Sequence, residues 1–207
     1  MSKLIATTFL SLDGVYQGPG GVDEDTSGGF DLGGWVTPFY EEGMAALAEE
    51  WIARAGAFLL GRRTHDIFAA HWPKVTDPAD PLASGLNGLP KHVVSRTLKD
   101  SPWSGTSIVA GDVVESVRDL KSRPGDELQV HGSGELLRTL IDHDLVDEYR
   151  LWFFPVVLGK GRRLFPDGVV PKKFEHVETR RTGAGGTVLV LRPAGKPEFD
   201  TFRLVSE

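Results

Sequence analysis

Two stretches of the chain place glycines between an apolar strand pattern and a helix pattern, an arrangement suited to holding phosphate. In the first, the apolar run Leu128–Val130 leads into the residues His131-Gly132-Ser133-Gly134-Glu135-Leu136. The first backbone N–H groups of a helix have no intrahelical partners, and the helix dipole favours negative charge there. The glycines would let a ligand approach the backbone, and Ser133 is expected to cap the helix or to bind the ligand directly. A purely structural turn explains the same residues equally well.

This turn shares part of the dinucleotide-binding fingerprint, in which three glycines open the helix and an acidic residue follows about 20 positions later. The third glycine is missing, because Leu136 and Leu137 follow Glu135. The nearby acids Asp147 and Glu148 precede the next strand pattern instead of ending it. The sequence therefore argues against a Rossmann domain.

The second stretch adds positive charge at a helix start. It reads Leu59-Leu60-Gly61-Arg62-Arg63-Thr64, and a third cationic group follows another strand pattern at Val94-Ser95-Arg96. Cations are disfavoured at a helix N-terminus, so the adjacent arginines indicate an anionic partner; a solvated basic helix end is the alternative. In open α/β sheets, ligands bind beyond the carboxyl ends of the strands. We therefore expect the three strand ends to converge on one ligand.

The composition excludes several classes of chemistry. The 207 residues include no cysteine, which rules out disulfides, thiolate zinc sites and a thiol nucleophile. A net charge of −6 argues against general nucleic-acid binding, because affinity for the phosphate backbone needs a cationic face. The six histidines are scattered over different predicted elements, and the acids in 142–148 lack EF-hand spacing, so we expect no metal site. A Gly-x-Ser-x-Gly elbow, the mark of many serine hydrolases, is also absent.

The chain shows no signs of membrane insertion. Apolar stretches fall short of the roughly 20 residues that a helix needs to span a bilayer. The run Leu4–Leu12 is interrupted by hydroxyl residues and followed by Asp13, which is typical of a first strand and not of a signal peptide. With 40% hydrophobic residues, the chain is expected to form one domain over residues 1–207, located in the cytoplasm.

Alternating strand and helix patterns through the first two thirds of the chain predict an α/β fold with a largely parallel sheet flanked by helices. After residue 147 the strand patterns follow one another without helices between them, so the C-terminal part is expected to be antiparallel. The predicted strands are Lys3–Leu10, Ala57–Leu60, His92–Ser95, Ser107–Ala110, Leu128–His131, Tyr149–Val157, Phe174–Arg181, Gly186–Arg192 and Phe199–Val205.

Helix starts are predicted from residues that can cap the first turn. Thr37 followed by Pro38 is typical of a cap and a first helical position, and Asp112 with Glu115 forms a capping-box-like start. Two segments, Gly14–Gly34 and Trp72–Pro90, fit neither strand nor helix and are predicted to be long loops. Loops of this length usually cover or shape a site, and mobile surface insertions are the alternative.

In order and spacing, the motifs resemble the dihydrofolate reductase-like superfamily, and more closely the reductase domain of riboflavin biosynthesis, the C-terminal half of bifunctional deaminase-reductases. The resemblance covers nearly the whole chain. The motifs are Ser11-Leu12-Asp13-Gly14, Gly61-Arg62-Arg63-Thr64, Val94-Ser95-Arg96-Thr97, Gly132-Ser133-Gly134-Glu135-Leu136, Leu145-Val146-Asp147-Glu148 and Pro155-Val156-Val157-Leu158-Gly159-Lys160-Gly161-Arg162-Arg163-Leu164-Phe165. The deaminase half is not expected, because its zinc site requires paired cysteines.

The resemblance implies NADPH as the cofactor and a mixed, mostly parallel sheet of the dihydrofolate reductase-like fold. Guanidinium groups suit the 2′-phosphate that distinguishes NADPH from NADH. The cofactor-binding residues that the resemblance implies are Thr7, Gly61, Arg62, Arg63, Thr64, Ser95, Arg96, Gly132, Ser133, Gly134, Glu135 and Leu136. The substrate-binding residues that it implies are Asp13, Gly14, Phe154 and Pro155.

Two departures from the folate enzymes limit the comparison. Dihydrofolate reductases join adjacent glycines by a cis peptide at the phosphate turn, whereas Gly132 is followed by Ser133 here, so the geometry of this bond stays open. Folate reductases also carry a carboxylate on the first long helix, for which Glu41 and Glu42 are the nearest candidates. Both glutamates are better explained as solvated residues of a helix start, so folate reduction is doubtful.

The sequence thus predicts an NADPH-dependent reductase of a small heterocyclic or sugar-phosphate substrate, and leaves the catalytic residues unassigned. By resemblance, the first substrate is the ribosylamino-pyrimidine phosphate of riboflavin synthesis. A pterin, a folate or another carbonyl or imine compound is the second. An NADP-binding module without activity is the alternative from a different class, and a homodimer through exposed strands around Pro155–Phe165 is a further expectation.

Overall fold

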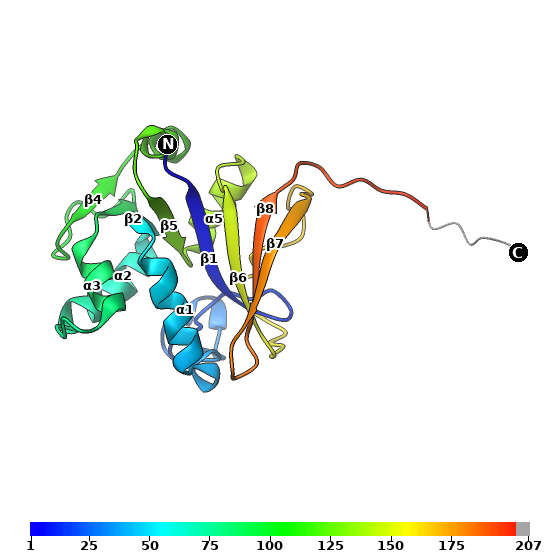
Figure 1. Cartoon of the computed structure of the whole chain (residues 1–207), viewed down its shortest axis with the longest axis horizontal. Helices are drawn as coiled ribbons and strands as arrows, with labels where there is room; N and C mark the ends of the chain where they lie inside the picture. The colour runs from blue at the N-terminus through cyan, green and yellow to red at the C-terminus, as the bar shows by residue number, and fades with distance from the viewer. Residues whose placement is uncertain (202–207) are drawn as a thin grey trace, which may run out of the picture.

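A computed structural model describes residues 1–201, which form one eight-stranded sheet with helices on both faces (Figure 1). The strands are β1 (Leu4–Ser11), β2 (Ala55–Gly61), β3 (Lys91–Val94), β4 (Thr106–Val109), β5 (Glu127–His131), β6 (Glu148–Phe154), β7 (Phe174–Arg181) and β8 (Thr187–Pro193). They lie in the order β4-β3-β2-β5-β1-β6-β8-β7. The strands from β4 to β6 are parallel, whereas β8 is antiparallel to both β6 and β7. The predicted mixed sheet with an antiparallel C-terminal part is confirmed.

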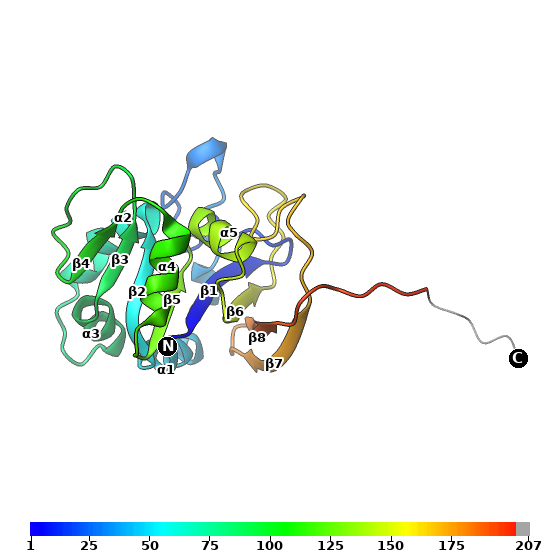
Figure 2. The same ribbon diagram turned by 90° about the horizontal axis from the view of Figure 1, so that it is seen from above.

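The helices cover the two faces of this sheet. They are α1 (Glu42–Ile52), α2 (Arg62–His71), α3 (Pro81–Gly88), α4 (Val113–Ser122) and α5 (Gly134–Asp142). Figure 2 shows α1 and α5 on opposite sides of the sheet. Apolar residues of α4 and α5 pack in one core cluster with Leu59, whereas Phe58 and Leu60 face a second cluster that includes residues of α2 and α3. The alternation along β2 follows from the opposite orientation of successive side chains in a strand.

The predicted start of the first helix was wrong. Thr37–Phe39 forms a separate 3-10 helix, and the extended backbone of Tyr40 separates it from α1. The cap of α1 is Glu41, whose carboxylate accepts hydrogen bonds from the N–H groups of Gly43 and Met44, both at 2.8 Å. Proline at the first position suits a short 3-10 turn as well as an α-helix, so the pattern at Thr37 could not distinguish them.

The predicted loop Trp72–Pro90 was also partly wrong, because it contains the helix α3. Asp80 caps α3 by accepting a hydrogen bond from Ala83 N at 2.9 Å, and Pro81 occupies the first helical position. The apolar residues Ala83 and Leu86 are buried. The cap and the following proline were readable signals, but two glycines inside the helix obscured its pattern.

The second predicted loop, Gly14–Gly34, is confirmed apart from a 3-10 turn at Ser27–Gly29. A hydrogen bond of 2.8 Å from Gly34 N to the carbonyl of Gly18 closes this loop at its base. A side chain on Gly33 would overlap the carbonyl oxygens of Gly21 and Val22, so glycine is required at this crossing. The loop is therefore a compact unit with its own internal contacts.

Within residues 1–201, none of the helices combines the length and the apolar character that crossing a membrane requires. Beyond β8 the chain leaves the body of the molecule as an extended segment, drawn in red in Figure 1. The predicted strand Phe199–Val205 was wrong for 199–201, which belong to no strand; positions 202–205 lie outside the described residues. Phe199 is 87% exposed, so no partner buries the apolar residue at which the predicted strand began.

Candidate functional site at the carboxyl ends of the strands

The parallel strands bring the predicted phosphate-binding segments together at one edge of the sheet. β2 ends at Gly61 and leads directly into α2, and β5 ends at His131, with two residues between it and the start of α5. These strands are neighbours in the sheet. The two helix N-termini are therefore adjacent, as the sequence predicted.

Ser133 joins the two helix starts. Its Oγ accepts a hydrogen bond from Gly61 N at 2.9 Å and lies 2.9 Å from Oγ1 of Thr64. A Cβ on Gly61 would come within 3.3 Å of the Ser133 side chain, so glycine allows this close contact. The hydroxyl thus fixes the position of α2 relative to the turn before α5.

The sequence left open whether Ser133 caps α5 or binds a ligand directly, and the structure places it at the cap without a capping bond from its side chain. Ser133 holds the N-cap position, but its hydroxyl makes no capping bond and its backbone is left-handed, with φ of 59°. Gly132 is left-handed as well, and the peptide bonds of the described residues are all trans. The first N–H groups of α5 are therefore not satisfied by the Ser133 side chain.

The predicted arginines lie around these helix starts, and each is largely exposed. Arg62 Nε donates to Asp66 one turn later in α2, at 2.6 Å, and Arg63 Nη1 donates to Asp25 of the Gly14–Gly34 loop at 3.1 Å. Arg96 follows the end of β3. Ser95 is buried, and its Oγ accepts hydrogen bonds from the N–H groups of the two residues after Arg96, so it shapes the turn that presents this arginine.

Asp13 locks the end of β1 to the segment after β6. Its carboxylate accepts hydrogen bonds from the Ser11 hydroxyl at 2.7 Å and from the N–H groups of Leu158 and Gly159 at 3.1 and 2.9 Å. Burial would raise the pKa of Asp13, but these hydrogen bonds outweigh it and hold the pKa well below its usual range. Both carboxylate oxygens are occupied within the chain. Gly14 beside it uses its carbonyl to accept a hydrogen bond from Leu164 N at 3.0 Å.

An aromatic cluster lies under α1 where β6 ends. Phe154 is fully buried there and packs against the rings of Phe9, Trp35 and Phe39 with centroids 5.6 to 6.0 Å apart. Phe154 therefore lies behind the surface and supports it from the interior, whereas the adjacent Pro155 is exposed. These rings fill the α1 side of the sheet edge with packed apolar groups.

Thr7 and His131 lie side by side on the paired strands β1 and β5, next to the turn that precedes α5. Gly132 N donates to the Thr7 carbonyl at 2.9 Å. Because the amide of Gln129 donates to Trp51 O, its carbonyl oxygen accepts from His131, and the proton of His131 resides on Nε2. Burial and the positive charge of Arg150 lower the pKa of His131 to about 4. His131 is therefore a neutral, oriented side chain at neutral pH.

Comparison with known proteins identifies the family of this chain. A family model for the RibD C-terminal domain matches residues 2–188. The chain belongs to the RibD C-terminal domain family. It is 31% identical over 190 residues to the protein YyaP of Bacillus subtilis (strain 168), covering 91% of this chain and 93% of that protein.

Solved structures of RibD-like proteins show the same fold. A protein assigned to riboflavin biosynthesis from Shewanella sp. PV-4 superposes with a TM-score of 0.65 at 22% identity, covering 92% of this chain and 98% of that one. A diaminohydroxyphosphoribosylaminopyrimidine deaminase/5-amino-6-(5-phosphoribosylamino)uracil reductase from Thermotoga maritima gives 0.63 at 17% identity, covering 93% of this chain and 57% of that one. The dihydrofolate reductase-like fold is thus confirmed.

Three side chains at this RibD-type sheet edge were not predicted from the sequence. The ring of Tyr16 packs directly on the α-carbon of Gly134, where any Cβ would overlap it. Asp25 binds Arg63 and also Arg162, which follows β6. The paired arginines after Gly161 were a usable signal, but an acid in a glycine-rich loop gives no indication of which cation it will meet.

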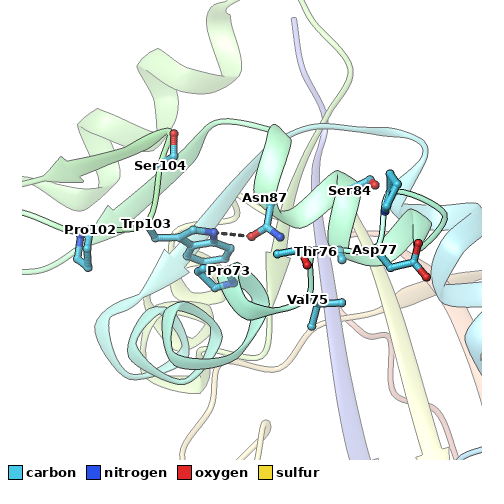
Figure 3. A pocket seen from close by; sticks show the side chains of 11 residues that line it. Pro73, Val75, Thr76, Asp77, Ser84, Asn87, Pro102, Trp103 and Ser104 are labelled. Carbon is cyan, nitrogen blue, oxygen red and sulfur yellow. Dashed lines mark hydrogen bonds between the residues drawn. The ribbon is translucent and has the colours of Figure 1, made fainter.

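A hollow on the RibD domain lies away from this sheet edge. It has a volume of about 420 Å³ and is bordered by Trp103, Asn87 and the 3-10 turn Trp72–Lys74 (Figure 3). Trp103 Nε1 donates to Asn87 Oδ1 at 2.9 Å. Asn87 precedes β3 and Trp103 precedes β4, so the hollow is at the amino ends of the strands. Among residues 1–201, groups of three or more side chains suited to a metal ion are also absent.

Proposed function

We propose that this protein is an NADPH-dependent reductase that transfers hydride to a small heterocyclic or sugar-phosphate substrate. The observation that carries the proposal is the pair of adjacent helix N-termini at Gly61 and Gly134, joined by Ser133 and surrounded by arginines. Membership of the RibD C-terminal domain family supports an oxidoreductase of the riboflavin type. The first substrate to test is 5-amino-6-(5-phosphoribosylamino)uracil, which the name of the Thermotoga protein specifies.

The donor groups at this edge fit a cofactor with several phosphates. Backbone N–H groups at two helix starts suit a pyrophosphate, and the planar forks of Arg62, Arg63 and Arg96 suit a terminal phosphate. Glycine at position 132 keeps the backbone open to a ligand, since a Cβ there would meet only the Thr64 hydroxyl, at 3.8 Å. One contact opposes the fit, because Tyr16 lies on Gly134. Phosphate binding at α5 therefore requires a different position of this ring.

In the proposed reaction, bound NADPH would supply the hydride from its nicotinamide ring. The protein would orient the reactants and exclude water. Arg63 and Arg96 would bind phosphate groups, and Ser133 would keep the two helix starts in register. The aromatic cluster around Phe154 would exclude water from the α1 side of the edge. Asp13 would act as a positioning residue, because its contacts hold the segment after β6 against the end of β1.

Folate reduction has weaker support than the pyrimidine reaction. Glu41, the nearest equivalent of a folate-binding carboxylate, accepts hydrogen bonds from the first turn of α1 and also from Gly183 N at 3.2 Å. These contacts give it a structural role at the helix cap. The interpretation of Glu41 as an ordinary helix-start residue explains its position.

Titration of the purified protein with NADPH and NADH, followed by tryptophan fluorescence, tests the cofactor. The proposal expects NADPH to bind more tightly than NADH, and equal or absent binding would contradict it. Turnover is then measured by NADPH oxidation with the pyrimidine phosphate and with dihydrofolate as separate substrates. Tight NADPH binding without turnover of either compound or of a carbonyl and imine panel would favour a non-catalytic binding module instead.

A further inference from the structure

Three charged side chains from separate segments meet beside the N-terminus of α2. Asp25 belongs to the Gly14–Gly34 loop, Arg63 to the first turn of α2, and Arg162 to the segment after β6. Both guanidinium groups donate to the same oxygen, Oδ2 of Asp25, with Arg63 Nη1 at 3.1 Å. The Asp25 side chain is only 10% exposed, whereas Arg63 is 52% exposed. The loop thus inserts an acid between two arginines.

The Asp25 carboxylate is held in its charged form. Its other oxygen, Oδ1, accepts a hydrogen bond from Ser27 N at 3.1 Å. Burial raises the pKa of Asp25, but the hydrogen bonds from Ser27 and the two nearby guanidinium charges outweigh burial and lower the pKa. A carboxylate and a phosphate oxygen offer arginine the same kind of charge-assisted acceptor. Two arginines placed to hold this carboxylate are therefore also placed to hold a phosphate oxygen.

Arg162 has further capacity to donate. Within the described residues, its Nε is a buried donor that has no hydrogen-bond partner, although its terminal nitrogen binds Asp25. Its backbone is fixed, because Arg162 N donates to Gln17 Oε1 at 3.1 Å and its carbonyl accepts from Tyr16 N at 3.0 Å. The backbone that carries this guanidinium is thus held by contacts that do not involve Asp25.

We propose that Asp25 is an internal competitor for an anion site formed by Arg63 and Arg162, and that a phosphate group of the ligand binds both arginines by displacing it. The inference rests on the proposed function, because it takes the ligand to be the phosphorylated cofactor. It adds Arg162 to the binding residues. It also makes the Gly14–Gly34 loop a determinant of affinity.

The Asp25 arm of the loop, residues 20–29, is held by Gln17 as well as by the arginines. Gln17 Nε2 donates to the carbonyls of Asp25 and Ser27 at 3.2 and 2.9 Å, so withdrawal of the arm must break these two bonds. Phe30 and Trp35 are buried in the core cluster under α1 and anchor the C-terminal part of the loop. The arm begins at the pair Gly20–Gly21 and ends at the pair Gly28–Gly29. Both glycines of the second pair have positive φ. Glycine changes backbone conformation at low cost, so these pairs can serve as hinges. Tyr16, which covers Gly134, belongs to the same loop and precedes this arm.

The first experiment compares NADPH affinity between Asp25→Asn and a matched control, Asp23→Asn. Asp23 lies on the same arm and is exposed, so its substitution removes the same charge without touching the arginines. We expect Asp25→Asn to tighten NADPH binding by about 3- to 10-fold, the range for losing one charge-assisted competitor, and Asp23→Asn to change it less than 2-fold. Adding Arg162→Gln to Asp25→Asn should abolish the gain. Equal affinities for the two single variants would overturn the proposal.

The second experiment needs no NADPH and separates this inference from the proposed function. Hydrogen exchange of the amides in 20–29 is measured for the wild-type protein with and without inorganic pyrophosphate. Displacement of Asp25 predicts faster exchange with pyrophosphate, to the level of Asp25→Asn, and no further change in that variant. Unchanged exchange at saturating pyrophosphate would overturn the inference even if NADPH binds. If pyrophosphate speeds exchange in a protein that does not bind NADPH, the anion site of Arg63 and Arg162 would be supported and the proposal of NADPH as the cofactor would be contradicted.

Discussion

At the scale of single residues, the three arginines of the proposed site differ in their ion-pair partners. Arg96 follows β3 and is exposed, whereas Arg62 and Arg63 each pair with an aspartate. The Arg62–Asp66 pair lies on the surface and contributes little to stability, and the more buried Asp25 keeps Arg162 as a partner when Arg63 is removed, so these substitutions should leave the fold intact. The effect of each substitution can therefore be attributed to ligand binding.

Replacing Arg63 or Arg96 with alanine should weaken NADPH binding by about 10-fold and NADH binding by much less, because a charge-assisted hydrogen bond to the 2′-phosphate is lost. Fluorescence titration of both nucleotides measures the ratio. Arg118→Ala is the control, since Arg118 is an exposed residue of α4 that pairs with Glu115. An unchanged NADPH-to-NADH ratio would remove the role assigned to the substituted arginine.

The pKa of His131 makes a prediction about stability. Its pKa is about 4 in the folded protein and near the ordinary value of 6.5 in the unfolded chain, so only the unfolded state binds a proton between these values. The contribution of His131 to the free energy of unfolding should therefore be highest above pH 6.5 and fall by on the order of 3 kcal/mol as the pH decreases to 4. Urea denaturation of the wild type and of His131→Gln measures this, and an equal pH slope for both would show that other groups cause it.

Ser133 combines a hydroxyl contact with a left-handed backbone, and two substitutions separate these effects. Ser133→Ala and Ser133→Gly both lose the acceptor of Gly61 N, which should cost about 1 kcal/mol each. The glycine variant should recover up to about 1 kcal/mol of this cost, because glycine adopts the positive φ without the strain that serine and alanine both bear. Thermal and urea unfolding compare the variants. A glycine variant more stable than the wild type would mean that backbone strain outweighs the hydroxyl contact.

At the scale of elements, hydrophobic patterns and caps predicted most of the fold, and the errors have identifiable causes. The strands are placed within a few residues, and the cap of α4 at Asp112 is as predicted, with its carboxylate accepting from Glu115 N at 3.0 Å. The start of α1 was misplaced because its cap is a glutamate, which rarely holds that position. The Asp25 contacts could not be predicted, because they join three segments whose meeting depends on the tertiary fold.

Lys91 shows how a short helix, α3, is held by tertiary contacts. Its buried Nζ donates to the carbonyls of Leu86 and Asn87 at the end of α3, both at 2.9 Å, and lies 4.6 Å from the Trp103 ring. Burial lowers the pKa of Lys91 to about 8, so it remains charged at pH 7. Lys91→Met leaves the carbonyls without this donor and should cost about 2 kcal/mol in urea unfolding. The exposed Lys99→Met is the control, and equal stability of the two variants would refute the capping role.

At the scale of the whole molecule, we propose a homodimer, with apolar surface near the segment after β6 as the interface. That segment is a loop and not the exposed strand that the sequence predicted, because β6 ends at Phe154. Phe165 and Val170 are 38% and 54% exposed and line a small hollow together. Exposed apolar clusters of this kind often mark interfaces.

The dimer should be seen by sedimentation at micromolar concentration, and Val170→Asp should convert it to a monomer with unchanged circular dichroism. Val22→Asp is the control, because Val22 is an exposed valine in a different loop. A wild-type monomer at 100 µM, taken as roughly the upper limit for a specific weak dimer, would contradict the proposal.

The central position of β1 has a consequence for how the chain folds during synthesis. Leu4 N donates to the carboxylate of Asp147, which lies 143 positions later, and both sheet neighbours of β1 come from the second half of the sequence. A ribosome adding about 5 to 20 residues each second would need on the order of ten seconds to produce those partners. During that interval an apolar strand has both of its edges unpaired. Nascent chains that stop before β5 should therefore remain protease-sensitive and bind chaperones, and cotranslational folding should begin only after β6 has emerged from the ribosome.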